Sequence, residues 1–124
     1  MSGQWQLTAQ ASAAQATAAV TSGTVAGQVI RLRSVFFSLS GTSAGAVTVV
    51  VRDGATGAGT IIWQGSLNSA ANAGDFILQN GLDVRATSGT LTVESTASGG
   101  ANTTTSLNAS GDFVQLGASY LGGA

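Results

Sequence analysis

The side chains that could carry out acid–base, nucleophilic or metal chemistry are few in this sequence. It contains no His and no Cys, which excludes Ser–His and Cys–His nucleophilic schemes and metal sites built on imidazole or thiolate within one chain. Five carboxylates remain, scattered singly: Asp53, Asp75, Asp83, Glu94 and Asp112. A carboxylate pair can hydrolyse glycosidic bonds, and Asp53 and Asp83 are candidates because both flank expected strands. The simpler interpretation is that they are turn and surface acids. We therefore expect no catalytic residues and no enzymatic activity.

Two kinds of loop site are also weakly indicated. Calcium binds loop carboxylates and carbonyls, but no DxDxDG-type loop occurs here. The Gly-rich stretch GATGAG, residues 54–59, is superficially similar in composition to a phosphate-binding loop. It lacks Lys, however, and it connects two expected strands rather than a strand and a helix. We expect neither a cofactor nor a metal ion.

Charged residues make up only 7% of the 124 residues, against about 25% in ordinary soluble domains. The formal net charge is -1, and the basic residues are Arg31, Arg33, Arg52 and Arg85. So few cations argue against nucleic-acid binding, which requires several Lys or Arg to displace counterions. A weakly charged surface has little electrostatic protection against association, which favours a surface covered by neighbours. A compositionally biased genome is the alternative explanation.

No run of 18 apolar residues occurs, so we expect no transmembrane helix and no membrane partner. The first residues, MSGQWQLTAQ, lack the basic and apolar regions of a secretory signal.

The elements that must position any site are strands. Residues 47–67 predict two strands joined by a Gly-rich loop, because apolar and polar side chains alternate on both sides of it. A single hairpin is marginal in water, so other strands must cover its apolar face. We expect Trp63 to be buried there with Val49, Val51 and Ile61.

The first part of the chain is rich in Ala and Gln, which suggests a helix on propensity alone. Residues 4–20 nevertheless alternate with a period of two and change phase at Ala13–Ala14, which predicts one long strand with a bulge. An Ala-rich helix and a mobile arm are the alternatives. Because Ala buries little area, we expect this segment to be poorly held by its own domain and to pack against another subunit. We therefore divide the single domain into residues 1–24, an extended arm or strand, and residues 25–124, a β-sandwich.

The remaining strands follow the same period of two. A change of parity near Ser34, within the long strand 25–40, predicts a second bulge or a crossing between sheets. The Asn80–Gly81 dipeptide predicts a tight turn after a short strand at Phe76 and Leu78. The further expected elements are a hairpin over residues 82–94, a long exposed loop over 95–111 and a last strand over 113–121. About eight strands with frequent turn signals predict an all-β fold, a jelly-roll-like antiparallel β-sandwich.

Aromatic and Arg side chains are the candidates for contact with partners. Trp5 is expected either to anchor on a neighbouring subunit or to cap the end of the sandwich core. Arg31 and Arg33 share the polar face of one strand, where they are either solvated or form interface ion pairs. Stacking of aromatic rings on sugars is the alternative use of the aromatics. The expected interface residues are Trp5, Leu7, Arg31, Arg33 and Tyr120.

Four short motifs recur in order along residues 30–96, about half of the chain. They are RLRS at Arg31–Ser34, RDG at Arg52–Gly54, GLDV at Gly81–Val84 and GTLTV at Gly89–Val93. In these motifs the chain resembles a type of small virion protein in tailed bacteriophages. The resemblance implies a β-sandwich structural subunit located in the phage particle, such as a head decoration (cement) protein. No catalytic residue is implied.

The resemblance also implies partners. These are other copies of the chain, in a homo-oligomer such as a trimer, and other virion proteins such as the major capsid protein. A tail or fibre component is the alternative within the virion. A carbohydrate-binding β-sandwich module and a glycan-degrading enzyme that uses carboxylates are alternatives from other classes.

Overall fold

The structure, a computed structural model, describes residues 4–21 and 28–115. These residues form eight strands and one short 3-10 turn. The elements are β1 (Gln4–Ser12), β2 (Thr17–Thr21), β3 (Gln28–Ser40), β4 (Val47–Asp53), β5 (Thr60–Leu67), η1 (Ala70–Asn72), β6 (Asp75–Ala86), β7 (Thr90–Ser95) and β8 (Thr104–Gln115). Among these residues no helix has the length and hydrophobicity that a membrane span requires. The expected last strand overlaps the end of β8, and its residues 116–121 lie outside the described part of the chain.

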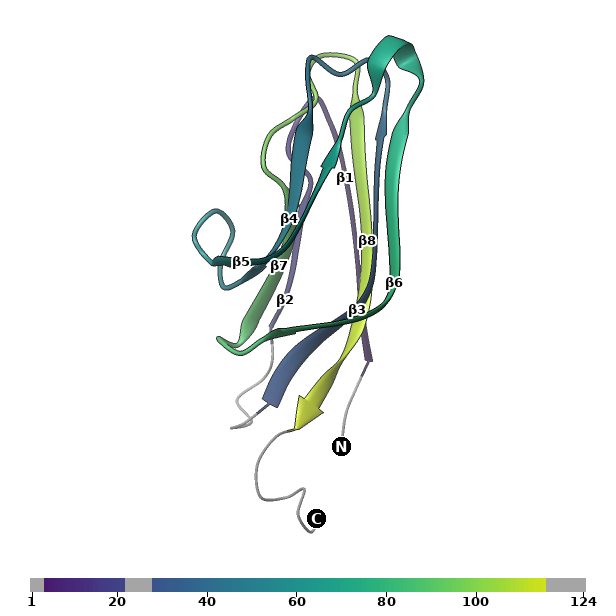
Figure 1. Ribbon diagram of the computed structural model, residues 1–124. Helices are drawn as coiled ribbons and strands as arrows, with labels where there is room; N and C mark the ends of the chain where they lie inside the picture. Colours follow the sequence, from purple (N-terminus) through teal and green to yellow (C-terminus); the bar gives the residue numbers. More distant parts are fainter. Residues whose placement is uncertain (1–3, 22–27, 116–124) are drawn as a thin grey trace.

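Two four-stranded antiparallel sheets lie face to face (Figure 1). Sheet A has the order β1-β8-β3-β6, and sheet B has the order β2-β7-β4-β5. The two orders describe one long ribbon rolled on itself. The hairpin β4–β5 is its tip, followed by the pairs β3–β6, β2–β7 and β1–β8. This nesting is the jelly-roll arrangement, so the predicted all-β, jelly-roll-like sandwich is confirmed.

The core between the two sheets is mostly aliphatic. Its largest fully buried apolar side chains are Phe37, Ile30, Leu32, Leu39, Leu67, Leu91, Val35, Val49, Val50, Val51 and Val93. Trp63 of β5 is half-buried and packs against this core, and its ring stacks on Phe37 of β3 with centroids 6.0 Å apart and planes 6° apart. The stacked pair therefore links the two sheets.

The prediction that Ile61 shares the buried face of Trp63 is wrong. A bulge in the β4–β5 ladder places Val51 opposite Trp63 but Arg52 opposite Ile61, so Ile62 is the extra residue. The extra residue reverses the parity of the strand. Ile61 consequently faces outward and is 44% exposed.

Residues 4–21 form two strands in different sheets, so the prediction of one bulged strand over residues 4–20 is wrong. β1 belongs to sheet A and β2 to sheet B, and the chain crosses between them at Ala13, whose φ of +53° is left-handed. The phase change at Ala13–Ala14 therefore marks a sheet crossing. β1 is the edge strand of sheet A and pairs with β8 along its whole length, so one side of its backbone is hydrogen-bonded within its own domain.

The Asn80–Gly81 dipeptide lies inside the twelve-residue strand β6 rather than in a hairpin turn. The β3–β6 register passes from the pair Leu32–Val84 to the pair Ser34–Asn80, and Gly81 has a φ of +73°. The ladder is thus bulged there, and the β3–β8 ladder is also irregular between Leu32 and Ser34. The bulge predicted near Ser34 is confirmed, while the predicted tight turn is wrong. β6 then bends across the end of the sandwich toward β7 (Figure 1).

The low-complexity stretch 95–111 is only in part a loop. Residues 104–111 belong to β8, the strand that lies between β1 and β3. Thr105, Leu107 and Ala109 are buried, and the polar residues between them face outward. The prediction of a long exposed loop is therefore wrong for the half that supplies an inner strand.

Candidate interaction surface

The outer face of sheet A carries exposed apolar side chains at one end. Phe76 and Leu78 of β6 are 64% and 54% exposed. The register places Leu78 beside Phe36 of β3, and the rings of Phe36 and Phe76 lie 6.1 Å apart with planes inclined by 31°. We call Phe36, Phe76 and Leu78 the apolar stripe. Neighbouring side chains on one face of a sheet present a joint surface, so the stripe offers one contiguous apolar contact area.

The rest of this face around the stripe is polar and uncharged. One row across the sheet runs from Thr8 through Asn108 to Phe36 and Leu78, and a shallow hollow of about 330 Å³ lies beside Phe36. The next row along the strands is Gln6, Ser110, Ser34 and Asn80. The Oγ atoms of Ser34 and Ser110 are hydrogen-bonded at 2.6 Å. A partner that covers these hydroxyls and amides must replace the hydrogen bonds that they make to water, but it does not have to desolvate a charge there.

Ion pairs occupy the other end of the same face. Arg31 donates two hydrogen bonds to Asp112, from Nε to Oδ1 and from Nη2 to Oδ2, both at 2.8 Å. Arg85 pairs with Asp83 in the same way at 2.9 and 3.2 Å. The hydrogen bond from Arg31 lowers the pKa of Asp112, and that from Arg85 lowers the pKa of Asp83. Both carboxylates are therefore charged and engaged at neutral pH.

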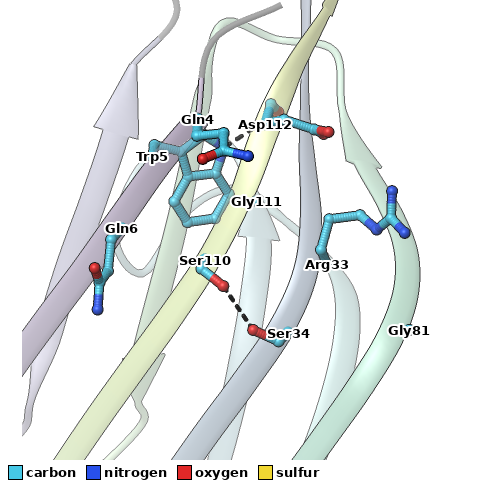
Figure 2. Close-up of a pocket in the computed structure, with 9 residues that line it drawn as sticks. All are labelled: Gln4, Trp5, Gln6, Arg33, Ser34, Gly81, Ser110, Gly111 and Asp112. Atoms are coloured by element: carbon cyan, nitrogen blue, oxygen red, sulfur yellow. Dashed lines mark hydrogen bonds between the residues drawn. The ribbon is translucent and has the colours of Figure 1, made fainter.

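An open hollow of about 640 Å³ lies beside these pairs (Figure 2). It is lined by Gln4, Trp5, Gln6, Arg33, Ser34, Gly81, Ser110, Gly111 and Asp112. Figure 2 shows Arg33 extending from β3 on the side of Gly81, with Trp5 and Gln6 of β1 on the opposite side. Arg33 is the extra residue of β3 at the bulge, and bulges re-aim side chains in this way.

Trp5 of β1 and Gly111 of β8 form a close cross-strand pair beside this hollow. They are directly opposite in the register, and a Cβ atom at position 111 would lie 1.8 Å from the Arg31 carbonyl oxygen and 2.7 Å from Cζ2 of Trp5. Only glycine fits there without a shift of the backbone. The Trp5 indole is 8% exposed, packs with the core and donates through Nε1 to the Asp112 carbonyl at 3.2 Å.

The structure brings together three of the five predicted interface residues. Trp5 and Arg33 line the hollow, and Arg31 joins them through Asp112. Leu7 is half-buried against the core, and Tyr120 lies outside the described residues. Trp5 caps the core of the isolated chain, as in the second of its two expected roles, and a role of these residues in an interface stays a prediction.

The sequence reasoning missed the apolar stripe. The alternation of β3 places Phe36 and Phe37 on opposite faces of the strand, and this pattern could have indicated that Phe36 faces outward. Phe76 and Leu78 gave no such signal, because their orientation depends on the bulge at Gly81.

The carboxylates outside this face hold loops in place. Glu94 is 2% exposed, and its Oε1 accepts hydrogen bonds from Arg52 Nε at 2.7 Å and from the Gly57 N–H at 3.1 Å. These bonds fasten the Gly-rich loop 54–59 to sheet B. Asp53 accepts hydrogen bonds from the backbone N–H groups of Thr87 and Ser88 at 3.1 and 2.9 Å. Within residues 4–21 and 28–115, no three carboxylates gather into a group that could hold a metal ion.

Comparisons with known proteins add no assignment to this geometry. No protein-family model matches the chain, and no curated protein matches it.

Proposed function

We propose that this chain is a non-enzymatic structural protein of a tailed-bacteriophage virion, a capsid decoration (cement) protein that stabilises the particle through contacts between subunits. The observation that carries the proposal is the apolar stripe, exposed on the outer face of sheet A and bordered by uncharged polar side chains. The motif resemblance over residues 30–96 supports the phage assignment. Jelly rolls also recur in viral capsid proteins, which supports it by analogy of fold only.

The stripe is large enough to contribute substantially to binding. Complete burial of a Phe or Leu side chain is worth about 1.5–3 kcal/mol, and Phe76 and Leu78 still expose more than half of their surface. Covering these two side chains would therefore contribute roughly 2–3.5 kcal/mol. A polar rim around an apolar centre is the usual anatomy of an interface. A standard interface buries roughly 800 Å² per side, so a stable partner would cover much of the outer face of sheet A in addition to the stripe.

In this role the protein acts by adhesion. It forms a homo-oligomer, such as a trimer, and it binds virion proteins such as the major capsid protein across the outer face of sheet A. A position in the tail or in a fibre would use the same surface.

The test is reattachment of purified protein to particles that lack it, measured by co-sedimentation. The Phe76→Ser/Leu78→Ser double variant should bind about tenfold or more weakly, because the apolar contribution is lost. Ile61→Ser is the matched control, since Ile61 is an exposed apolar residue of sheet B, and it should bind like the wild type. Equal binding by all three proteins would contradict the proposal.

Carbohydrate binding is the second candidate, and the paired rings of Phe36 and Phe76 favour it. Exposed aromatic rings flanked by hydroxyl and amide groups can stack on sugars, and jelly rolls also occur in lectins. Affinity electrophoresis in gels containing host polysaccharide separates the two functions. Retardation that is lost in Phe76→Ala would favour the carbohydrate-binding module over the cement protein.

A further inference from the structure

We infer that the hollow beside Arg33 binds a carboxylate side chain on a segment of the partner protein that covers sheet A. This inference rests on the proposed docking role of that face, and it names the chemistry of the partner. Four observations carry it: the charge balance of the chain, the composition of the hollow, the bulge that shapes it and its position next to the apolar stripe.

In the part of the chain that the structure describes, Arg33 is the one Arg side chain without a salt bridge, although its charge acts at longer range on Asp83 and Asp112. All nine charged side chains of the sequence lie in described residues. The other three Arg residues each have a carboxylate, in the pairs Arg31–Asp112, Arg52–Glu94 and Arg85–Asp83. The two remaining acids accept backbone hydrogen bonds, Asp53 from Thr87 and Ser88 and Asp75 from Asn68 and Phe76. Among the described residues, no carboxylate is free to neutralise Arg33.

The surroundings of Arg33 are positive although the chain as a whole is negative. Three Arg and two Asp residues gather at this end of the outer face, and the formal net charge of the chain is -1. Asp112 also lines the hollow and would repel an anion. Its two oxygens, however, already accept hydrogen bonds from Arg31, so its charge is largely compensated. Charge complementarity therefore favours an anionic group in this position.

The lining of the hollow suits a carboxylate held by a guanidinium. The hydroxyls of Ser34 and Ser110 and the amides of Gln4 and Gln6 supply neutral hydrogen-bonding groups around Arg33. The guanidinium fork matches the two oxygens of a carboxylate. The volume of about 640 Å³ leaves room for a carboxylate side chain together with part of its backbone.

The position of the hollow indicates that the anion is part of a protein segment rather than a free ion. The row that contains Ser34 and Asn80 is followed along the strands by the row that contains Phe36 and Leu78. A segment lying along β3 would therefore set an Asp or Glu against Arg33 and an apolar residue against the stripe. A free phosphate ion or a neutral sugar would use only one of these two neighbouring features.

The experiment is particle reattachment of Arg33→Gln, which keeps hydrogen-bonding capacity but removes the charge. Asp83→Asn/Arg85→Gln is the matched control, because it removes an ion pair from the same face without changing the net charge. We expect Arg33→Gln to bind about 10- to 100-fold more weakly and Asp83→Asn/Arg85→Gln to bind nearly like the wild type. Wild-type binding by Arg33→Gln, together with weak binding by Phe76→Ser/Leu78→Ser, would overturn this inference and leave the proposed function standing. Failure of the wild-type protein itself to bind would count against the proposed function.

A solution measurement tests the inference without particles. NMR spectra of the protein are recorded with the peptide acetyl-Glu-Ala-Leu-Phe-amide, with its Gln analogue and with inorganic phosphate. The Glu peptide alone should shift the Trp5 indole and Gly111 amide signals, and Arg33→Gln should abolish the shift. If phosphate causes the same shifts as the Glu peptide, the hollow is a simple anion site. If the Gln peptide causes the same shifts, the negative charge of the Glu side chain does not contribute to binding. If sedimentation velocity shows a dimer of the wild type that is lost in Arg33→Gln, the occupant of the hollow is a second copy of this chain. Each of these three results, or the absence of any shift, would overturn the inference.

Discussion

Replacement of Gly111 by Ala tests the close approach of β8 to the backbone of β3 and to the Trp5 ring of β1. The new Cβ atom would lie 1.8 Å from the Arg31 carbonyl oxygen and 2.7 Å from Cζ2 of Trp5. The first contact is with backbone, so no change of rotamer can relieve it. β8 and β3 would have to separate. Displacement of the Trp5 ring would also stretch the hydrogen bond from Trp5 Nε1 to the Asp112 carbonyl.

The expected cost follows from this geometry. Overpacking of a well-packed interior usually costs about 1–3 kcal/mol, and a backbone contact this short belongs at the upper end or beyond it. We expect a loss of about 3 kcal/mol in the free energy of unfolding. A domain of this kind has about 5–15 kcal/mol in total, so the variant should fold but be clearly weakened.

Urea unfolding followed by Trp fluorescence measures this loss. With an m value of about 1–3 kcal/mol/M, the midpoint should fall by about 1–3 M. Gly45→Ala is the matched control, because nothing lies within 4 Å of a Cβ atom there and its φ is not left-handed. It should be neutral or stabilising by less than about 1 kcal/mol. If Gly111→Ala is no less stable than Gly45→Ala, the close approach of β1, β8 and β3 is wrong.

Three further predictions concern the core, the loop and the ion pairs. Trp63→Ala should lower the free energy of unfolding in urea by about 2–4 kcal/mol, less than the loss of a fully buried ring. Ile61→Ala is the control and should cost under about 1 kcal/mol, because Ile61 is exposed. Equal losses in the two variants would contradict the stacking of Trp63 on Phe37. Glu94→Gln should lower the free energy of unfolding by about 2–4 kcal/mol, because Arg52 loses its buried carboxylate. Limited proteolysis of loop 54–59 should also become faster, and an unchanged cleavage rate would show that the Arg52–Glu94 pair does not hold the loop. Because Arg31 holds the pKa of Asp112 below that of an unfolded Asp, about 3.9, the pair contributes stability above that pH and loses it as pH falls through the lowered pKa. Asp112→Asn should therefore flatten the decline of the urea midpoint between about pH 5 and pH 2, and an unchanged slope would contradict this.

The fold class could be predicted from the sequence because alternation is a local property of a strand. The bulge near Ser34 and the hairpin over residues 47–67 were visible for the same reason. The phase change at Ala13–Ala14 was visible too, but it does not say whether the chain bulges or changes sheets. That choice is made by long-range pairing, here of β1 with β8, whose residues lie about a hundred positions apart in the sequence.

The candidate surface could be predicted only in part. Arg31 and Arg33 were found because they share one short strand segment. Phe76 and Leu78 were missed as outward-facing residues, since their orientation depends on a bulge that Gly81 makes inside β6. Asn80–Gly81 predicted a tight turn, but Gly81 uses its positive φ in a bulge, because a hairpin turn and a bulge require the same backbone freedom. Thr105, Leu107 and Ala109 were missed because a polar, small-residue composition hid their alternation.

Footprinting of intact particles tests the central claim most directly. Purified virions of the proposed phage source, and the free protein, are labelled with hydroxyl radicals and analysed by mass spectrometry. We expect the chain to be present in the particles, with Phe36, Phe76 and Leu78 protected from labelling and Ile61 labelled as in the free protein. Absence of the chain from purified particles, or equal labelling of the apolar stripe in both samples, would contradict the account.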